Sequence, residues 1–318
     1  MTLPWRAWRL TFALQRQELL ILLGATALLV VGSLLAARMT SEARVAFDAC
    51  VTKVVEGSDA CRSLSAPLND LSSWEGVTKL AAQWSPMILG LFLGVPVVAR
   101  EIEGRTAPIA WALDPGRGRW LFQRALPVLA VALVAGILIG IGGEMVTQAP
   151  PFREHPLGAG FSDYGSRLGQ VPVRTVAVLV LGVAVGALVP RQLPAVLLTG
   201  AATLVLFTAL TLGMGAWMQA AAEPIPMDQG YESGARVFEQ AFRDNATGAL
   251  ISTVDFDQQQ IGSEDLESTA PPGMTRVWLG IPGNEYGQWV VRESGIVLGL
   301  TLIVGVATLV VVRRRRPG

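Results

Sequence analysis

Long apolar runs alternate with polar segments along the whole chain. A helix rises 1.5 Å per residue, so about 20 consecutive apolar residues cross the hydrocarbon core of a bilayer. Six runs approach this length, and they predict membrane spans over residues 19–37, 80–99, 121–143, 174–190, 192–218 and 294–312. The fourth run is short, so we expect its helix to include residues 171–173, with Arg174 reaching toward the membrane interface. The pattern predicts an all-α membrane protein with six transmembrane helices.

The composition agrees with this class and argues against several kinds of chemistry. Charged residues make up only 16% of the 318 residues, whereas soluble domains carry about 25%. A single histidine and two cysteines argue against a metal or haem site built on clusters of these residues. The sequence has no P-loop and no charged residue at the centre of a predicted span, where an ion-coupled transporter keeps one. If the chain transports a substrate, we expect the energy to come from another chain.

The distribution of arginine predicts how the chain is oriented. Segments 1–18 and 100–124, the turn at Arg191 and the tail 313–318 together hold 13 arginines against four acidic residues. Because positive residues favour the cytoplasmic side, both termini are predicted to be cytoplasmic, with residues 1–18 forming a basic amphipathic helix. The segments predicted to face outward are residues 38–79, 144–173 and 219–293.

We expect helical structure in the outer loops after the first and fifth spans. In the second of these loops, apolar residues at helical spacing precede two stop signals, namely Val237, Phe238, Ala241 and Phe242 followed by Asn245 and Gly248. Trp278 and Trp289 lie closer to the last span, where they suit an aromatic belt at the bilayer interface or a short re-entrant element.

Cys50 and Cys61 both fall in the first outer loop. Disulfides persist on that side of the membrane, so we predict that these two residues are bonded to each other. Two free thiols are the alternative.

Glycines four residues apart recur in four spans, as Gly90 and Gly94, Gly136 and Gly140, Gly182 and Gly186, and Gly295 and Gly299. This spacing lets two helix backbones approach closely. We expect the glycines to serve packing within one subunit, and a seam between two copies is the alternative.

A charged segment follows the second span, in the stretch VVAREIEGRTAPIAWALDPGRGRW over residues 97–120. A helix end rich in arginine and glutamate breaks at Gly104, and residues 106–113 form a short, mildly amphipathic helix before a turn at residues 114–116. Charge in an inner loop ordinarily reflects topology alone. Here the carboxylates alternate with arginine and a rigid break precedes a surface helix, an arrangement that suits docking to a partner.

The same stretch resembles the loop between the second and third spans of permeases in the type-2 ABC-transporter family, actinobacterial members in particular. The family pattern there is Arg-Glu-x-Glu-x-Gly-Thr, and Arg100, Glu101, Glu103 and Thr106 occupy its positions. The glycine departs from the pattern, since it stands one place early as Gly104 and Arg105 replaces it.

This resemblance implies that residues 100–120 hold a coupling helix that docks on a separate ABC ATPase. The residues implied in coupling are Arg100, Glu101, Glu103, Gly104, Arg105 and Thr106. Two permease copies would pair with two ATPase subunits in the bacterial plasma membrane and export a lipophilic or amphipathic substrate. ATP and Mg²⁺ would bind to the partner, so this chain would have no cofactor, no catalytic residue and no nucleic-acid partner, and lipids would surround it. The alternative is a membrane-embedded sensor or scaffold whose outer domain binds a ligand or an envelope partner.

Overall fold

A computed structural model describes residues 16–53, 59–107, 109, 116–148, 160–227, 234–252 and 272–314, with only the backbone for residues 48, 51–53 and 59–69. The chain forms two compact units. The helical unit comprises Met1–Ala149, Asp163–Thr208 and Val290–Gly318, and the sheet unit comprises Pro150–Ser162 and Ala209–Trp289.

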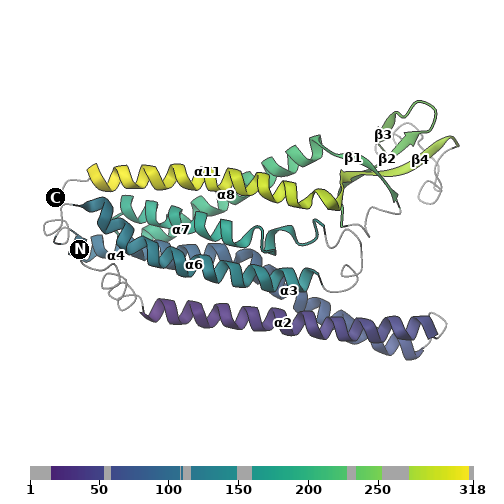
Figure 1. Ribbon diagram of the computed structural model, residues 1–318, viewed down its shortest axis with the longest axis horizontal. Helices are drawn as coiled ribbons and strands as arrows, with labels where there is room; N and C mark the ends of the chain where they lie inside the picture. The colour runs from purple at the N-terminus through teal and green to yellow at the C-terminus, as the bar shows by residue number, and fades with distance from the viewer. Residues whose placement is uncertain are drawn as a thin grey trace. The chain divides into compact units, whose positions relative to one another are not determined.

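The described residues contain six helices that are long and apolar enough to cross a membrane, which confirms the predicted fold class. Their elements are α2 (Arg16–Lys53), α3 (Asp59–Gly94) with α4 (Pro96–Glu103), α6 (Arg117–Thr147), α7 (Val171–Leu188), α8 (Gln192–Ala220) and α11 (Tyr286–Arg314). The helix α7 begins at Val171, as its short apolar run predicted. Within the helical unit, α2 begins and α11 ends at the same end as α4, which we call the α4 end (Figure 1).

The helices α2 and α3 extend well beyond the first two predicted spans. The described residues of the segment 38–79 are almost entirely helical, so the two helices form a long antiparallel hairpin (Figure 1). Cys50 lies near the end of α2 and Cys61 near the start of α3, but the side chain of Cys61 is outside the described residues. The disulfide between them therefore stays a prediction.

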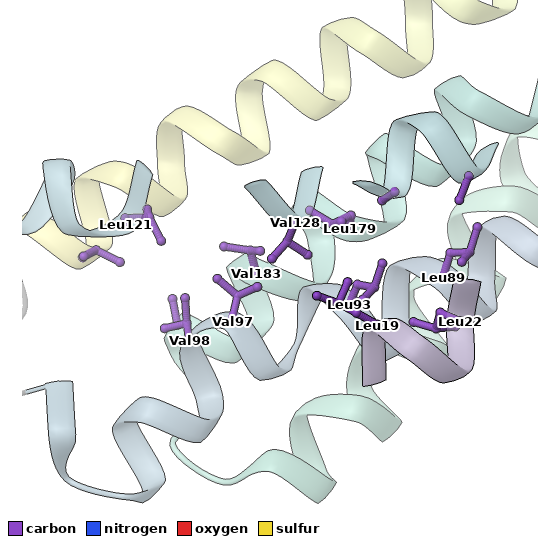
Figure 2. Packing of buried hydrophobic residues seen from close by; sticks show 14 of the residues in the cluster. Leu19, Leu22, Leu89, Leu93, Val97, Val98, Leu121, Val128, Leu179 and Val183 are labelled. Atoms are coloured by element: carbon purple, nitrogen blue, oxygen red, sulfur yellow. The ribbon is translucent and has the colours of Figure 1, made fainter. Parts of the chain in front are cut away.

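Apolar side chains from six helices, including Val312 of α11, meet in the core of the helical unit (Figure 2). The cluster includes Leu19 and Leu22 of α2, Leu89 and Leu93 of α3, Val97 and Val98 of α4, Leu121 and Val128 of α6, and Leu179 and Val183 of α7. The break between α3 and α4 lies at Pro96, which lacks the N–H that would continue the helix. This break redirects the chain so that α4 keeps its first turn in the core and exposes its charged end.

Three of the four glycine pairs lie against other segments of the same chain. A Cβ atom built on Gly90 would overlap Cβ of Val178 on α7, and one on Gly186 would lie 2.8 Å from the carbonyl oxygen of Val95. By contrast, a Cβ atom on Gly295 or Gly299 would meet no atom within 4 Å. The glycines on α3, α6 and α7 therefore serve packing within one subunit, as expected.

Replacing Gly90 with alanine is expected to lower the free energy of unfolding by about 1–3 kcal/mol, because the added methyl group forces α3 and α7 apart. The matched control is Gly299→Ala, which adds the same group to open space and should change stability by no more than about 1 kcal/mol. Thermal unfolding of the purified full chain in detergent measures both. Equal losses in the two variants would contradict the close α3–α7 contact.

The sheet unit corrects the prediction of a helix after the fifth span. Residues Arg236–Asp244 form strand β2, which lies between β4 (Met274–Ile281) and β3 (Leu250–Ser252), and β1 (Glu223–Pro226) lies on the outer side of β4. All pairs in this four-stranded sheet are antiparallel.

The apolar spacing in β2 mimics a helix for a local reason. Its apolar residues form two adjacent pairs four residues apart, a spacing that a helix also shows, and the register shift between Val237 and Glu239 makes the strand irregular. Pairing with strands on both sides then determines the conformation, since such tertiary pairing overrides a weak local pattern. Trp278 and Trp289 are 8% and 1% exposed, so their assignment to an interfacial belt is also wrong.

The turn after β2 is held by an aspartate. The Asp244 carboxylate accepts hydrogen bonds from the backbone N–H groups of Ala246, at 2.8 Å, and Thr247, at 3.3 Å. These bonds stabilise the ionised form and lower the pKa of Asp244 below its ordinary value.

Candidate functional site

The helix α4 carries the charges that the sequence singled out. Its first four residues are buried in the helical unit, and its last turn leads into the polar residues. The N–H of Gly104 donates to the Arg100 carbonyl at 2.9 Å, and the N–H of Arg105 donates to the Ile102 carbonyl at 3.1 Å, which ends the helix. Arg105 has a φ of 57°, in the left-handed region that glycine adopts most easily. Arg105, which stands where the pattern in the sequence analysis has glycine, thus ends the helix in the left-handed conformation.

Replacing Arg105 with glycine is expected to raise the free energy of unfolding by up to about 1 kcal/mol, because glycine relieves the left-handed backbone. The same substitution at Arg119, an exposed residue inside α6, should lower it by about 1 kcal/mol, since glycine weakens a regular helix. Thermal unfolding of the two variants should shift in opposite directions. A loss of stability in Arg105→Gly would show that the arginine side chain contributes more than the strain costs.

Glu101 faces inward and binds two groups of its own chain. Its carboxylate accepts a hydrogen bond from the Arg124 guanidinium of α6 at 2.6 Å and another from the Thr106 hydroxyl, also at 2.6 Å. The side chains of Arg124 and Glu101 are only 18% and 15% exposed. A charge-assisted pair with so little solvent is stronger than an exposed one, so Glu101 connects α4 firmly to α6.

Glu103 and Arg100 connect α4 to two further helices. The Glu103 carboxylate accepts the backbone N–H of Gln192, at 2.9 Å, at the first residue of α8. The N–H groups of a first helical turn lack partners within the helix and carry the positive end of its dipole, so a carboxylate there is favoured. The Arg100 guanidinium lies 3.0 Å from the Glu18 carboxylate of α2. That pair is more exposed and contributes at most about 1 kcal/mol.

We call this set the α4 polar layer, and it comprises Glu18, Arg100, Glu101, Glu103, Thr106, Arg124 and the N–H of Gln192. The sequence analysis named four members of this layer, Arg100, Glu101, Glu103 and Thr106. It missed Glu18, Arg124 and Gln192. Their signal was present in the sequence, because all three stand at the ends of apolar runs predicted to face the same side.

Only part of the predicted site is exposed to a partner. Glu101 is directed toward α6, whereas Gly104 and Arg105 are exposed and Ile109 is 63% exposed. Of the predicted surface helix over residues 106–113, the structure describes Thr106, Ala107 and Ile109, and the remainder is outside the described residues. The site therefore has an inner part that joins helices and an outer part that is accessible.

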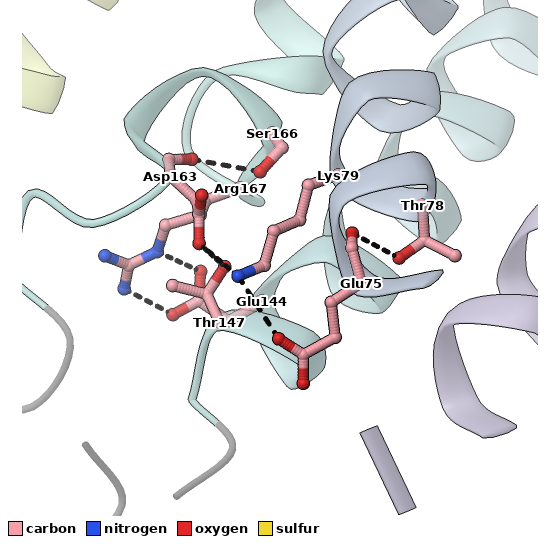
Figure 3. A network of polar contacts seen from close by, with 8 residues as sticks. All are labelled: Glu75, Thr78, Lys79, Glu144, Thr147, Asp163, Ser166 and Arg167. Carbon is pink, nitrogen blue, oxygen red and sulfur yellow. Dashed lines mark hydrogen bonds and ion pairs between the residues drawn. The ribbon is translucent and has the colours of Figure 1, made fainter. Parts of the chain in front are cut away.

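A second polar network lies around the short helix η2 (Tyr164–Ser166) and joins α3, α6 and the chain before α7 (Figure 3). Lys79 of α3 lies 2.7 Å from the Asp163 carboxylate and 3.7 Å from that of Glu75. The Arg167 guanidinium holds the Glu144 carboxylate with two bonds, through Nε at 2.9 Å and Nη2 at 2.5 Å. Each of these charges has an opposite partner. The network therefore serves to hold α3, α6 and the chain before α7 together.

A third ion pair joins α7 to α11. The Arg174 guanidinium lies 2.7 Å from the Glu293 carboxylate, and the two side chains are 14% and 3% exposed. The same guanidinium lies over the Phe207 ring of α8, 5.6 Å from its centroid. The expectation that Arg174 reaches toward the interface stays a prediction, and the structure adds that a buried carboxylate from a residue distant in sequence compensates its charge.

Comparison with known proteins places this geometry in a family context. The model of the family described as ABC-2 membrane transporter related matches residues 19–219, which covers more than half of the chain. No curated protein and no solved structure matches. The matched region contains the α4 polar layer except for Glu18, the network around η2 and nearly all of the first five spanning helices.

Proposed function

The chain belongs to the ABC-2 membrane transporter related family, and on this premise we propose that it is the permease of an exporter. It is a multi-pass protein of the bacterial plasma membrane and a membrane permease subunit of an ABC transporter. Membership also implies an ABC ATPase partner. The proposal adds that two copies of this chain pair with two ATPase subunits, which bind ATP and Mg²⁺, and that a lipophilic or amphipathic substrate leaves the cell.

The single observation that carries the proposal is the position of α4. Its charged end is bonded to α2 through Arg100, to α6 through Glu101 and to α8 through Glu103. A force applied to α4 is therefore transmitted to three other helices without passing through a flexible segment. Such a joint suits a permease that must convert movement of a partner into movement of its spanning helices.

In the proposed mechanism, the ATPase contacts the accessible part of the site, which includes Arg105 and Ile109. Closure of the ATPase pair on ATP displaces α4. Glu101 then carries the displacement to α6 through Arg124, and Glu103 carries it to α8 through the N–H of Gln192. The α4 end faces the cytoplasm in this account, as the arginine distribution predicts.

Affinity purification of the full chain from its native membranes tests the partnership directly. We expect a P-loop ATPase to co-purify with the wild-type chain, and Ile109→Asp to abolish its recovery, because a charge replaces an exposed apolar contact. The control is Val45→Asp, which changes an equally exposed residue (62%) in the segment predicted to face outward. Absence of any ATPase from the wild-type preparation would favour a sensor or scaffold instead.

A further inference from the structure

A long groove separates α2 from α3 within the helical unit. Its volume is about 950 Å³, and Ile139 of α6 contributes to its floor. On α3 its lining runs from Asp70 to Leu89, which corresponds to about 28 Å of helix. This length is close to the roughly 30 Å thickness of the hydrocarbon core of a bilayer. The groove is therefore about as long as the hydrocarbon core is thick.

The groove is narrow because small residues create it. Ala25, Gly32 and Ala36 of α2 and Ala81 of α3 all line it, and a Cβ atom on Gly32 would meet no atom within 4 Å. Small side chains along both helices thus leave an open channel between α2 and α3.

The walls offer an occupant almost no hydrogen bonds. Two hydroxyl groups on α3 line the groove, but Thr78 donates to the Glu75 carbonyl at 2.9 Å and Ser85 donates to the Ala82 carbonyl at 2.8 Å. Both hydroxyls are thereby used within their own helix. An alkyl chain has no polar group, so it leaves no hydrogen bond unmade in such surroundings.

One end of the groove differs from the rest in charge. Asp70 is exposed there and makes no ion pair or hydrogen bond among the described residues, and Trp74, one turn away, is 66% exposed. Two basic residues of these helices are already paired, Arg38 with Glu42 at 2.9 Å and Lys79 with Asp163 at 2.7 Å. The rim carries the Asp70 carboxylate beside the aromatic face of Trp74, a combination that attracts a cation.

We infer that this groove binds one alkyl chain of a membrane-resident amphiphile whose positively charged head lies against Asp70 and Trp74. The amphiphile is the transported substrate if the proposed export function holds, so this inference deepens that proposal and rests on it for its biological role. The binding itself requires neither the ATPase nor transport.

Photolabelling of the full chain in phosphatidylcholine vesicles, without the ATPase, tests the binding. The probes are three diazirine-bearing hexadecyl compounds with trimethylammonium, hydroxyl or sulfate heads. We expect the cationic probe to label peptides of α2 and α3, and Gly32→Leu to lower this labelling about tenfold, equivalent to about 1.4 kcal/mol, because leucine fills the groove. Gly24→Leu is the matched control, since Gly24 is equally open and lies on the same helix outside the groove lining.

The Asp70→Asn variant should weaken labelling by the cationic probe severalfold and leave labelling by the hydroxyl probe unchanged. Undiminished labelling of Gly32→Leu, or equal labelling by all three head groups, would overturn the inference. So would an unlabelled groove together with chemical cross-links that join α2 or α3 of two copies, because the occupant would then be a second copy.

Addition of the ATPase separates this inference from the proposed function. Labelling without ATP-driven movement of the cationic amphiphile would leave the groove assignment intact and refute its export. Movement of the amphiphile by Gly32→Leu at the wild-type rate would refute the groove and leave export standing.

Discussion

Removing the carboxylate of Glu293 is expected to lower the free energy of unfolding by about 3–5 kcal/mol, because it leaves the Arg174 charge buried without its partner. The pair is only 14% and 3% exposed, so little solvent is present to compensate. Thermal unfolding of Glu293→Ala in detergent measures the loss. The matched control is Glu42→Ala, which breaks an exposed ion pair with Arg38 (79% and 66% exposed) and should cost less than about 1 kcal/mol.

Replacing both partners distinguishes a charge effect from a packing effect. In Arg174→Met combined with Glu293→Leu, no buried charge remains, so we expect most of the stability to return. A double variant as unstable as Glu293→Ala would contradict this reasoning and would place the contribution in the Arg174 contact with Phe207 instead. The pair joins two helices that sequence reasoning treated separately.

Reversing the charges of Glu101 and Glu103 to lysine is expected to uncouple the permease from its partner. The Glu101–Arg124 attraction becomes a repulsion, and the N-terminus of α8 meets a positive charge instead of a carboxylate. We expect ATP hydrolysis to continue in vesicles that contain the permease and its ATPase, while ATP-dependent export falls at least about tenfold. Retained co-purification of the ATPase excludes simple loss of the complex.

A charge exchange tests the α6 connection by itself. Glu101→Arg should reduce export, and the addition of Arg124→Glu should recover part of it, because the pair is restored with opposite polarity. Reversal of the exposed pair Arg38–Glu42 by the same exchange should have no effect on export. Failure of Arg124→Glu to improve export would show that Glu101 does not act through α6.

The sequence predicted the membrane-spanning helices well for a clear physical reason. An unpaired backbone polar group is costly in hydrocarbon. A run of about 20 apolar residues in a membrane therefore forms a helix, because a helix pairs its backbone groups within the same segment. The glycine pairs were equally informative, since Gly90 and Gly186 lie where two backbones meet. Both signals are local and need no knowledge of the tertiary structure.

The sheet unit and the ion pairs depend on contacts that no local pattern contains. Strand β2 pairs with β3 and β4, and these pairings override the helical spacing of its apolar residues. The partner of Arg174 lies 119 residues away, and the partner of Glu101 in α6 lies 23 residues away. The residues predicted for coupling are nearly consecutive in the sequence, so their proximity is no test of the prediction, and the inward direction of Glu101 follows from α6 packing against α4.

The most direct test of the central claim is whether ATP moves the helices through the α4 polar layer. A spin label at Met145, an exposed residue near the last turn of α6, reports the distance between the two copies proposed for the assembly. We predict that ATP changes this distance in the wild-type complex and leaves it unchanged in Glu101→Lys/Glu103→Lys, although hydrolysis continues. The same ATP-dependent change in both complexes would contradict the account.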